Sequence, residues 1–71
     1  MYKVVELNSD NIIGIIDFNN LDQTGSLETY WNFKLDNKSK RLMTFDWSEA
    51  FKVYEQLTEW HPLRSFEIRN F

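Results

Sequence analysis

Between Trp47 and His61, apolar and polar residues recur with the period of an α-helix. When the residues are placed about 100° apart, polar side chains fill one half of the circumference and apolar or semi-apolar ones fill the other. The apolar half holds Trp47, Ala50, Phe51, Val53, Tyr54, Leu57, Thr58, Trp60 and His61. This separation predicts an amphipathic helix with one face on a hydrophobic core.

Both ends of this helix carry boundary signals. Asp46 is the predicted N-cap, because its carboxylate can accept a hydrogen bond from the first free backbone N–H groups. Glu49, three residues on, is expected to reach back and complete a capping box, while Phe45 packs on Ala50 as a hydrophobic staple. Pro62 ends the helix, since a proline disfavours helical geometry at the residue before it.

The rest of the chain predicts strands, because runs of β-branched and aromatic residues alternate with polar turn-forming clusters. The expected strands are residues 2–7, 11–18, 27–35, 41–45 and 63–71. We therefore predict a single small α+β domain over residues 1–71, with the element order β-β-β-β-α-β. Its mostly antiparallel sheet has about five strands, and the amphipathic helix packs on one face.

The second strand places apolar residues on both sides of this sheet. Strict alternation puts Ile12, Ile16 and Phe18 on one face and Ile13 and Ile15 on the other. Since one helix covers only one face, the second face needs a cover of its own. Strong sheet curvature, self-association or another protein would each supply it.

Composition places this fold in a cysteine-free, aromatic-rich class. The 71 residues contain no cysteine and 17% aromatic residues, so packing rather than disulfides must stabilise the domain. The net charge of −3 is unevenly distributed. Residues 1–33 carry five acids against Lys3 alone, whereas the remaining residues carry six acids and seven bases. The acidic half favours a partner with a basic surface.

The stretch DFNNLDQTGSLE, residues 17–28, has the length of a calcium-binding EF-hand loop and begins and ends with acids. An EF-hand loop needs an oxygen ligand at its fifth position and a glycine at its sixth. These positions hold Leu21 and Asp22, and the flanking segments are predicted strands instead of helices. We therefore expect no metal and interpret the segment as a loop with acidic side chains.

The sequence offers few groups for catalysis. His61 is the one histidine of the chain, and its place before Pro62 is typical of a helix C-cap. With no cysteine, no second histidine and no glycine-rich phosphate loop, we expect no catalytic residue, no cofactor and no enzyme activity.

A basic hairpin gives one alternative function. Tyr30, Lys34, Lys38, Lys40 and Arg41 combine an aromatic ring with cations, which is the chemistry of single-stranded nucleic-acid binding. The negative net charge argues against this hypothesis, because a phosphate backbone is repelled by an acidic protein.

The preferred hypothesis is a non-enzymatic protein-binding module, namely a small acidic inhibitor or adaptor that docks on a larger protein. Nucleic-acid-binding proteins are common carriers of the basic surface that it would need. In composition the chain resembles the short inhibitors that bacteriophages and mobile elements direct against host defence or replication proteins. The expected partner-binding residues are Asp10, Asp17, Asp22, Glu28, Tyr30 and Trp60.

Two further expectations accompany this hypothesis. A structural homodimer, in which the second sheet face pairs with itself, is a further alternative. No stretch approaches the apolar length of a membrane span, and the chain starts without a signal-like segment, so we expect a cytoplasmic protein without membrane contact.

Overall fold

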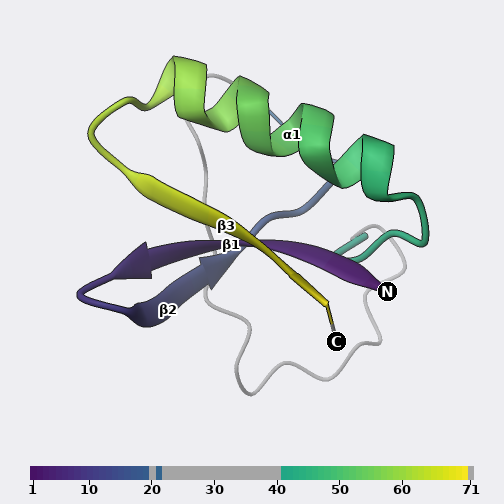
Figure 1. The fold of residues 1–71 in the computed structure, drawn as a ribbon, viewed down its shortest axis with the longest axis horizontal. Coiled ribbons are helices and arrows are strands. Elements are labelled where there is room, and N and C mark those ends of the chain that lie inside the picture. The colour runs from purple at the N-terminus through teal and green to yellow at the C-terminus, as the bar shows by residue number, and fades with distance from the viewer. Residues whose placement is uncertain (20, 22–40, 71) are drawn as a thin grey trace.

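The protein is an α+β structure in which one helix lies across one face of a small antiparallel sheet (Figure 1). The computed structural model describes residues 1–19, 21 and 41–70. The elements in this part of the chain are β1 (Tyr2–Asn8), β2 (Asn11–Ile15), α1 (Trp47–Trp60) and β3 (Ser65–Asn70). No helix among these residues has the length and apolarity that a membrane crossing requires.

The described sheet has three strands in the order β2-β1-β3, and not the predicted five or so. Both pairings are antiparallel. The predicted strand at residues 27–35 lies outside the described residues. The predicted strand at residues 41–45 is described but makes a single bridge, in which Thr44 and Tyr2 exchange two backbone hydrogen bonds of 2.8 and 2.9 Å. The carbonyl of Arg41, at the start of this segment, accepts from the N–H of Phe18 at 2.8 Å.

The helix begins as predicted, but with different neighbours around its cap. The Asp46 carboxylate accepts from the Ser48 N–H at 2.9 Å, which confirms the N-cap. The N–H of Asp46 donates to the Thr44 hydroxyl, so Glu49 does not close a capping box. The predicted staple is also wrong, since Phe45 is 82% exposed.

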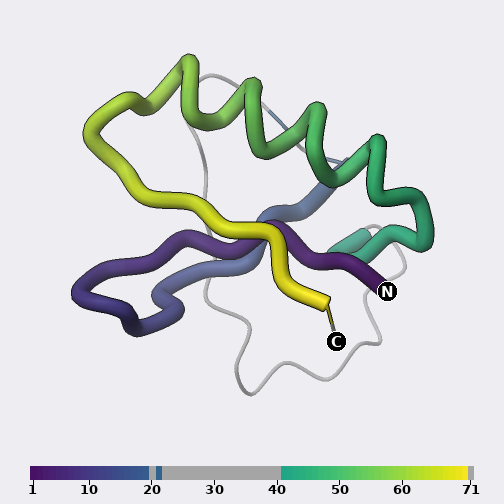
Figure 2. The backbone as a smooth tube through the Cα atoms, in the orientation of Figure 1, coloured from purple at the N-terminus to yellow at the C-terminus, as the bar shows by residue number. Residues whose placement is uncertain are grey.

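The end of α1 follows the prediction from Pro62. The last helical residue is Trp60, and the N–H of His61 donates to the Leu57 carbonyl at 2.8 Å. The chain then turns back under the helix and runs along β1 as β3, as the tube in Figure 2 shows.

A bulge in β2 changes which isoleucines share a face. The register steps from Glu6 opposite Gly14 to Leu7 opposite Ile12, so Ile13 is an additional residue in β2. Ile12 consequently packs with Ile15 and not with Ile16, in contrast to the strict alternation predicted from the sequence.

Each face of the sheet has its own apolar cluster. The helix side forms the main core, which consists of Val4, Ile16, Phe18, Ala50, Val53, Leu57 and Phe66. The opposite side has a smaller cluster of Val5, Ile15 and Leu42, with Leu7 and Ile12 packed against it. Ile15 and Ile16 are therefore both buried within the protein, on opposite faces. Of the four isoleucines expected to leave the sheet bare, these two are covered, Ile12 is half-buried and Ile13 is 41% exposed.

One ion pair ties the connection between α1 and β3 to the central strand. Glu6 in β1 is buried, and both of its carboxylate oxygens accept hydrogen bonds from the Arg64 guanidinium. The Arg64 guanidinium also lies 6.0 Å from the centre of the Phe66 ring. The hydrogen bonds that Arg64 donates to Glu6 raise the pKa of Arg64 above its ordinary value. This contact fixes the path of the chain as it leaves the helix.

Candidate functional site

A row of aromatic side chains follows one flank of α1. The Trp47 and Phe51 rings stack with their centroids 5.0 Å apart and their planes 15° apart. Phe51 continues to Tyr54, with the centroids 6.3 Å apart. These spacings of three and four residues place the side chains on neighbouring positions of one helix face. We call Trp47, Phe51 and Tyr54 the aromatic stripe.

Two rings of the stripe are exposed, whereas Tyr54 is half-buried and packs against the main core. Trp47 is 50% exposed and Phe51 37% exposed, whereas Ala50, Val53 and Leu57 on the adjacent helix face are buried. Phe45, just before the N-cap of the helix, is exposed as well. Single exposed apolar residues are common, but several large rings in contact with one another are typical of an interaction surface.

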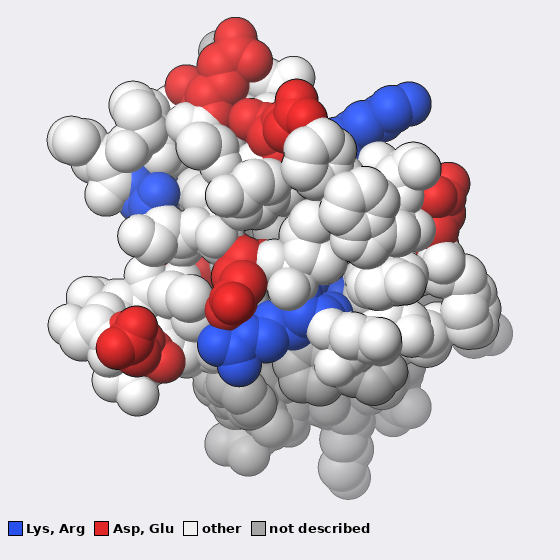
Figure 3. All heavy atoms as spheres, in the orientation of Figure 1, with Lys and Arg blue, Asp and Glu red and all other residues white. Residues whose placement is uncertain are grey.

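Two carboxylates lie beside the stripe on the next face of the helix. Glu55 is four residues from Phe51, and Glu59 is four residues further, so the side chains form a row parallel to the rings. Both are exposed, and neither takes part in an ion pair within the described part of the chain. Figure 3 shows carboxylates over the helix with uncharged surface below them.

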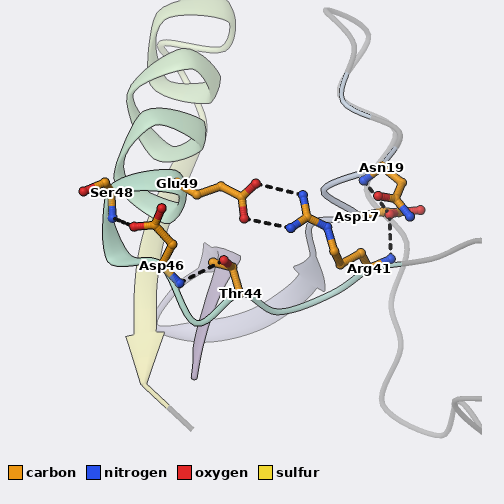
Figure 4. Close-up of polar contacts among 7 residues, drawn as sticks. All are labelled: Asp17, Asn19, Arg41, Thr44, Asp46, Ser48 and Glu49. Carbon is orange, nitrogen blue, oxygen red and sulfur yellow. Dashed lines mark hydrogen bonds and ion pairs between the residues drawn. The ribbon is translucent and has the colours of Figure 1, made fainter.

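The other flank of α1 carries a closed ion pair. Arg41 donates two hydrogen bonds of 2.8 Å to the two carboxylate oxygens of Glu49 (Figure 4). The Arg41 guanidinium also lies 5.4 Å from the centre of the Phe18 ring. The hydrogen bonds from Arg41, with a further one from Thr44, lower the pKa of Glu49 below its ordinary value. The same hydrogen bonds to Glu49 raise the pKa of Arg41. This pair anchors the first turn of the helix to residues 17–19 and 41.

The structure places three of the predicted partner-binding residues in different environments. Asp10 is exposed in the hairpin turn between β1 and β2. Asp17 is buried, and its carboxylate accepts from the N–H groups of Asn19 and Arg41, so it holds two chain segments together. Trp60 is half-buried against the main core, which is a packing position rather than an exposed anchor.

The other predicted partner-binding residues, Asp22, Glu28 and Tyr30, lie outside the described residues. The same is true of three residues of the basic hairpin, Lys34, Lys38 and Lys40. The fourth cation, Arg41, is described, and its guanidinium is bound by Glu49. Its charge is therefore already compensated by a carboxylate of the protein itself.

The described residues contain no cluster of three or more His, Cys, Asp or Glu side chains that could hold a metal ion. Two oxygen-bearing side chains of the segment with the length of an EF-hand loop, Asp17 and Asn19, are among the described residues. The Asp17 carboxylate accepts hydrogen bonds from the backbone N–H groups of Asn19 and Arg41. His61 is the C-cap of α1, as its position before Pro62 predicts. The centroid of its ring lies 6.4 Å from that of Phe66.

Sequence reasoning placed Trp47 and Phe51 in the apolar half of the helix and therefore in the core. The width of this apolar half indicates that some of its residues are exposed. Nine residues spread over half the circumference form a wider face than one sheet layer buries. The residues at one margin of such an arc then remain in solvent.

Comparison of the chain with protein-family models, with curated proteins and with solved structures gives no match.

Proposed function

We propose that this chain is a non-enzymatic protein-binding module that docks on a larger protein through the aromatic stripe of α1. The observation that carries the proposal is the stacked and exposed pair Trp47 and Phe51. Aromatic side chains are enriched at binding hot spots, because they bury much apolar area at a low entropic cost. The net charge of −3 favours a basic surface on the partner, as an inhibitor or adaptor of a nucleic-acid-binding protein would meet.

The exposed area is sufficient for an anchor. A large aromatic side chain buries roughly 150–250 Å², so covering the exposed half of Trp47 removes about 100 Å² from water, worth about 2.5 kcal/mol at about 25 cal/mol per Å². Phe51 adds further exposed area next to Trp47. The stacking of the rings also favours binding, because side chains that are already ordered lose little conformational freedom when a partner covers them.

The experiment combines site-specific photocrosslinking with matched surface variants in the source cells. A benzophenone side chain at position 51 is expected to capture a defined partner, whereas the same group at Asn8, the exposed last residue of β1, is not. The double variant Trp47→Ser with Phe51→Ser is expected to lose co-purification of that partner. Leu63→Ser is the control, because Leu63 is 99% exposed and apolar but lies outside the stripe.

Circular dichroism of each variant shows whether the fold is retained. Equal capture from positions 51 and 8, or equal loss of the partner in the stripe and control variants, would exclude the stripe as the docking surface. A cross-link between two copies of the chain would identify a homodimer instead.

A further inference from the structure

Two arginines of the chain make intramolecular contacts of the same kind. Each donates two hydrogen bonds to one glutamate, and each guanidinium lies over a phenylalanine ring. Arg41 uses Glu49 and the ring of Phe18. Arg64 repeats the arrangement with a different glutamate and ring, as described above. The arrangement combines a bidentate carboxylate contact with a cation–π contact, which is a combination that lysine does not reproduce.

The surface of α1 offers the same two groups side by side. Glu55 lies one helical turn from Phe51, whose ring is already stacked on Trp47. No arginine of the described residues lies on this pair, since Arg41, Arg64 and Arg69 are held by Glu49, Glu6 and Glu67. Glu55 is exposed, and the Phe51 ring is 37% exposed between the rings of Trp47 and Tyr54, so the carboxylate and the open part of this ring are within reach of an arginine from another molecule.

We infer that the partner presents arginine side chains to this surface, with one guanidinium on Glu55 beside the exposed part of the Phe51 ring and a second on Glu59. This inference rests on the proposed docking function and specifies its chemistry. Glu55 and Glu59 are four residues apart, which is about 6 Å along a helix. Two arginines four apart on a helix, or two apart on a strand, have a matching spacing.

Charge favours such a partner over a second copy of the chain. Residues 46–60 carry four acids and a single lysine. A symmetric dimer through α1 would bring these acidic faces together, and like charges at an interface oppose association. An arginine-bearing segment instead neutralises Glu55 and Glu59 and covers the rings in one step.

The probe is a 16-residue helical peptide on an alanine and leucine scaffold, with arginines four residues apart. Matched peptides carry lysine or glutamine at the same positions. Titration into the full chain is followed by amide chemical shifts in ¹H–¹⁵N NMR spectra. The arginine peptide is expected to shift the amides of Phe51, Glu55 and Glu59. The lysine peptide should bind two- to fivefold more weakly, and the glutamine peptide should cause no shifts.

Single variants test the two groups separately. Glu55→Gln and Phe51→Leu should each weaken binding of the arginine peptide about two- to fivefold, the range for exposed ion pairs and cation–π contacts. Glu67→Gln removes the same charge from a carboxylate of β3 and should leave the affinity unchanged. Raising the salt concentration should weaken binding of the arginine peptide in the unmodified protein and less so in Glu55→Gln.

Equal binding of the arginine and lysine peptides, or equal effects of Glu55→Gln and Glu67→Gln, overturns the arginine site. Shifts that map to other elements overturn it as well. If crosslinking at position 51 still captures a partner in those cases, the docking function stands and its arginine chemistry is wrong. If neither experiment gives a signal on α1, both proposals fail.

Discussion

The ion pair between Glu6 and Arg64 gives the sharpest stability prediction, because its two ends differ in burial. The Glu6 side chain is 7% exposed and that of Arg64 is 33% exposed. Replacing Arg64 by Met keeps most of the aliphatic stem but leaves a buried carboxylate without its two donors. Breaking a buried ion pair costs about 3–5 kcal/mol, and partial access of water to this site favours the lower end.

Replacing Glu6 should lower the free energy of unfolding less than replacing Arg64. Glu6→Gln retains an oxygen acceptor, and the partly exposed Arg64 can be hydrated, so we expect a loss of about 1–2 kcal/mol. Replacing both residues, Glu6 by Gln and Arg64 by Met, should cost less than the sum of the single changes, because the buried charge is then gone. A 71-residue domain has a free energy of unfolding of roughly 4–10 kcal/mol. The Arg64 variant should therefore lie close to the limit of stability.

Urea unfolding followed by tryptophan fluorescence measures these differences, provided that the slope of the transition stays the same among the variants. We expect the wild type to be the most stable, followed by Glu6→Gln and then Arg64→Met. The double variant should be more stable than the sum of the two single losses predicts. An Arg64→Met protein as stable as Glu6→Gln, or strictly additive effects, would show that the buried carboxylate does not depend on Arg64.

Three further predictions concern single positions. Ser9 and Asp10 both have a positive φ, of 51° and 66°, so Asp10→Gly should raise the free energy of unfolding by about 0.5–1 kcal/mol in urea denaturation. Because Arg41 lowers the pKa of Glu49, this pair contributes stability above the ordinary glutamate pKa of about 4.3 and loses it as the pH falls through the lowered value. Carboxyl NMR titration should therefore show the Glu49 pKa rising in Arg41→Met, and no rise would refute the contact. Phe45→Ser should change the unfolding free energy by less than about 0.5 kcal/mol, and a larger loss in urea denaturation would show that Phe45 packs as a staple after all.

The helix was predictable because its signals are local. The apolar period, the Asp46 cap and the Pro62 stop lie within the segment itself, and the structure confirms all three. The role of Glu49 was not predictable in this way. Its contact with Arg41 depends on tertiary structure and replaces the expected capping box. Local propensity carries no information about which cation a nearby chain segment will supply.

The sheet was harder to predict for a related reason. The additional residue Ile13 reverses the alternation of side chains in β2. Ile12 and Ile15 therefore lie on the same face of the sheet, whereas strict alternation places them on opposite faces. Nothing in the run of isoleucines marks the bulge, although Gly14 next to it is the residue type that such a bend tolerates. The exposure of the aromatic stripe was missed because helix periodicity predicts which residues share a face. It does not predict how wide a face the sheet will bury.

The apolar arc of α1 is wider than the face that the sheet buries, and this difference explains why the proposed docking surface is exposed. The sheet and the main core bury the centre of the apolar arc, at Ala50, Val53 and Leu57. The margin at Trp60 also packs on the core, whereas the opposite margin, at Trp47 and Phe51, faces solvent. Substitutions at the exposed margin disturb core packing less than substitutions at its centre, because fewer buried contacts are lost. The side chains of the stripe, on which we propose that a partner docks, can therefore change while the fold is retained. The same argument makes variants of Trp47 and Phe51 suitable tests of binding, since a loss of partner can be separated from a loss of structure.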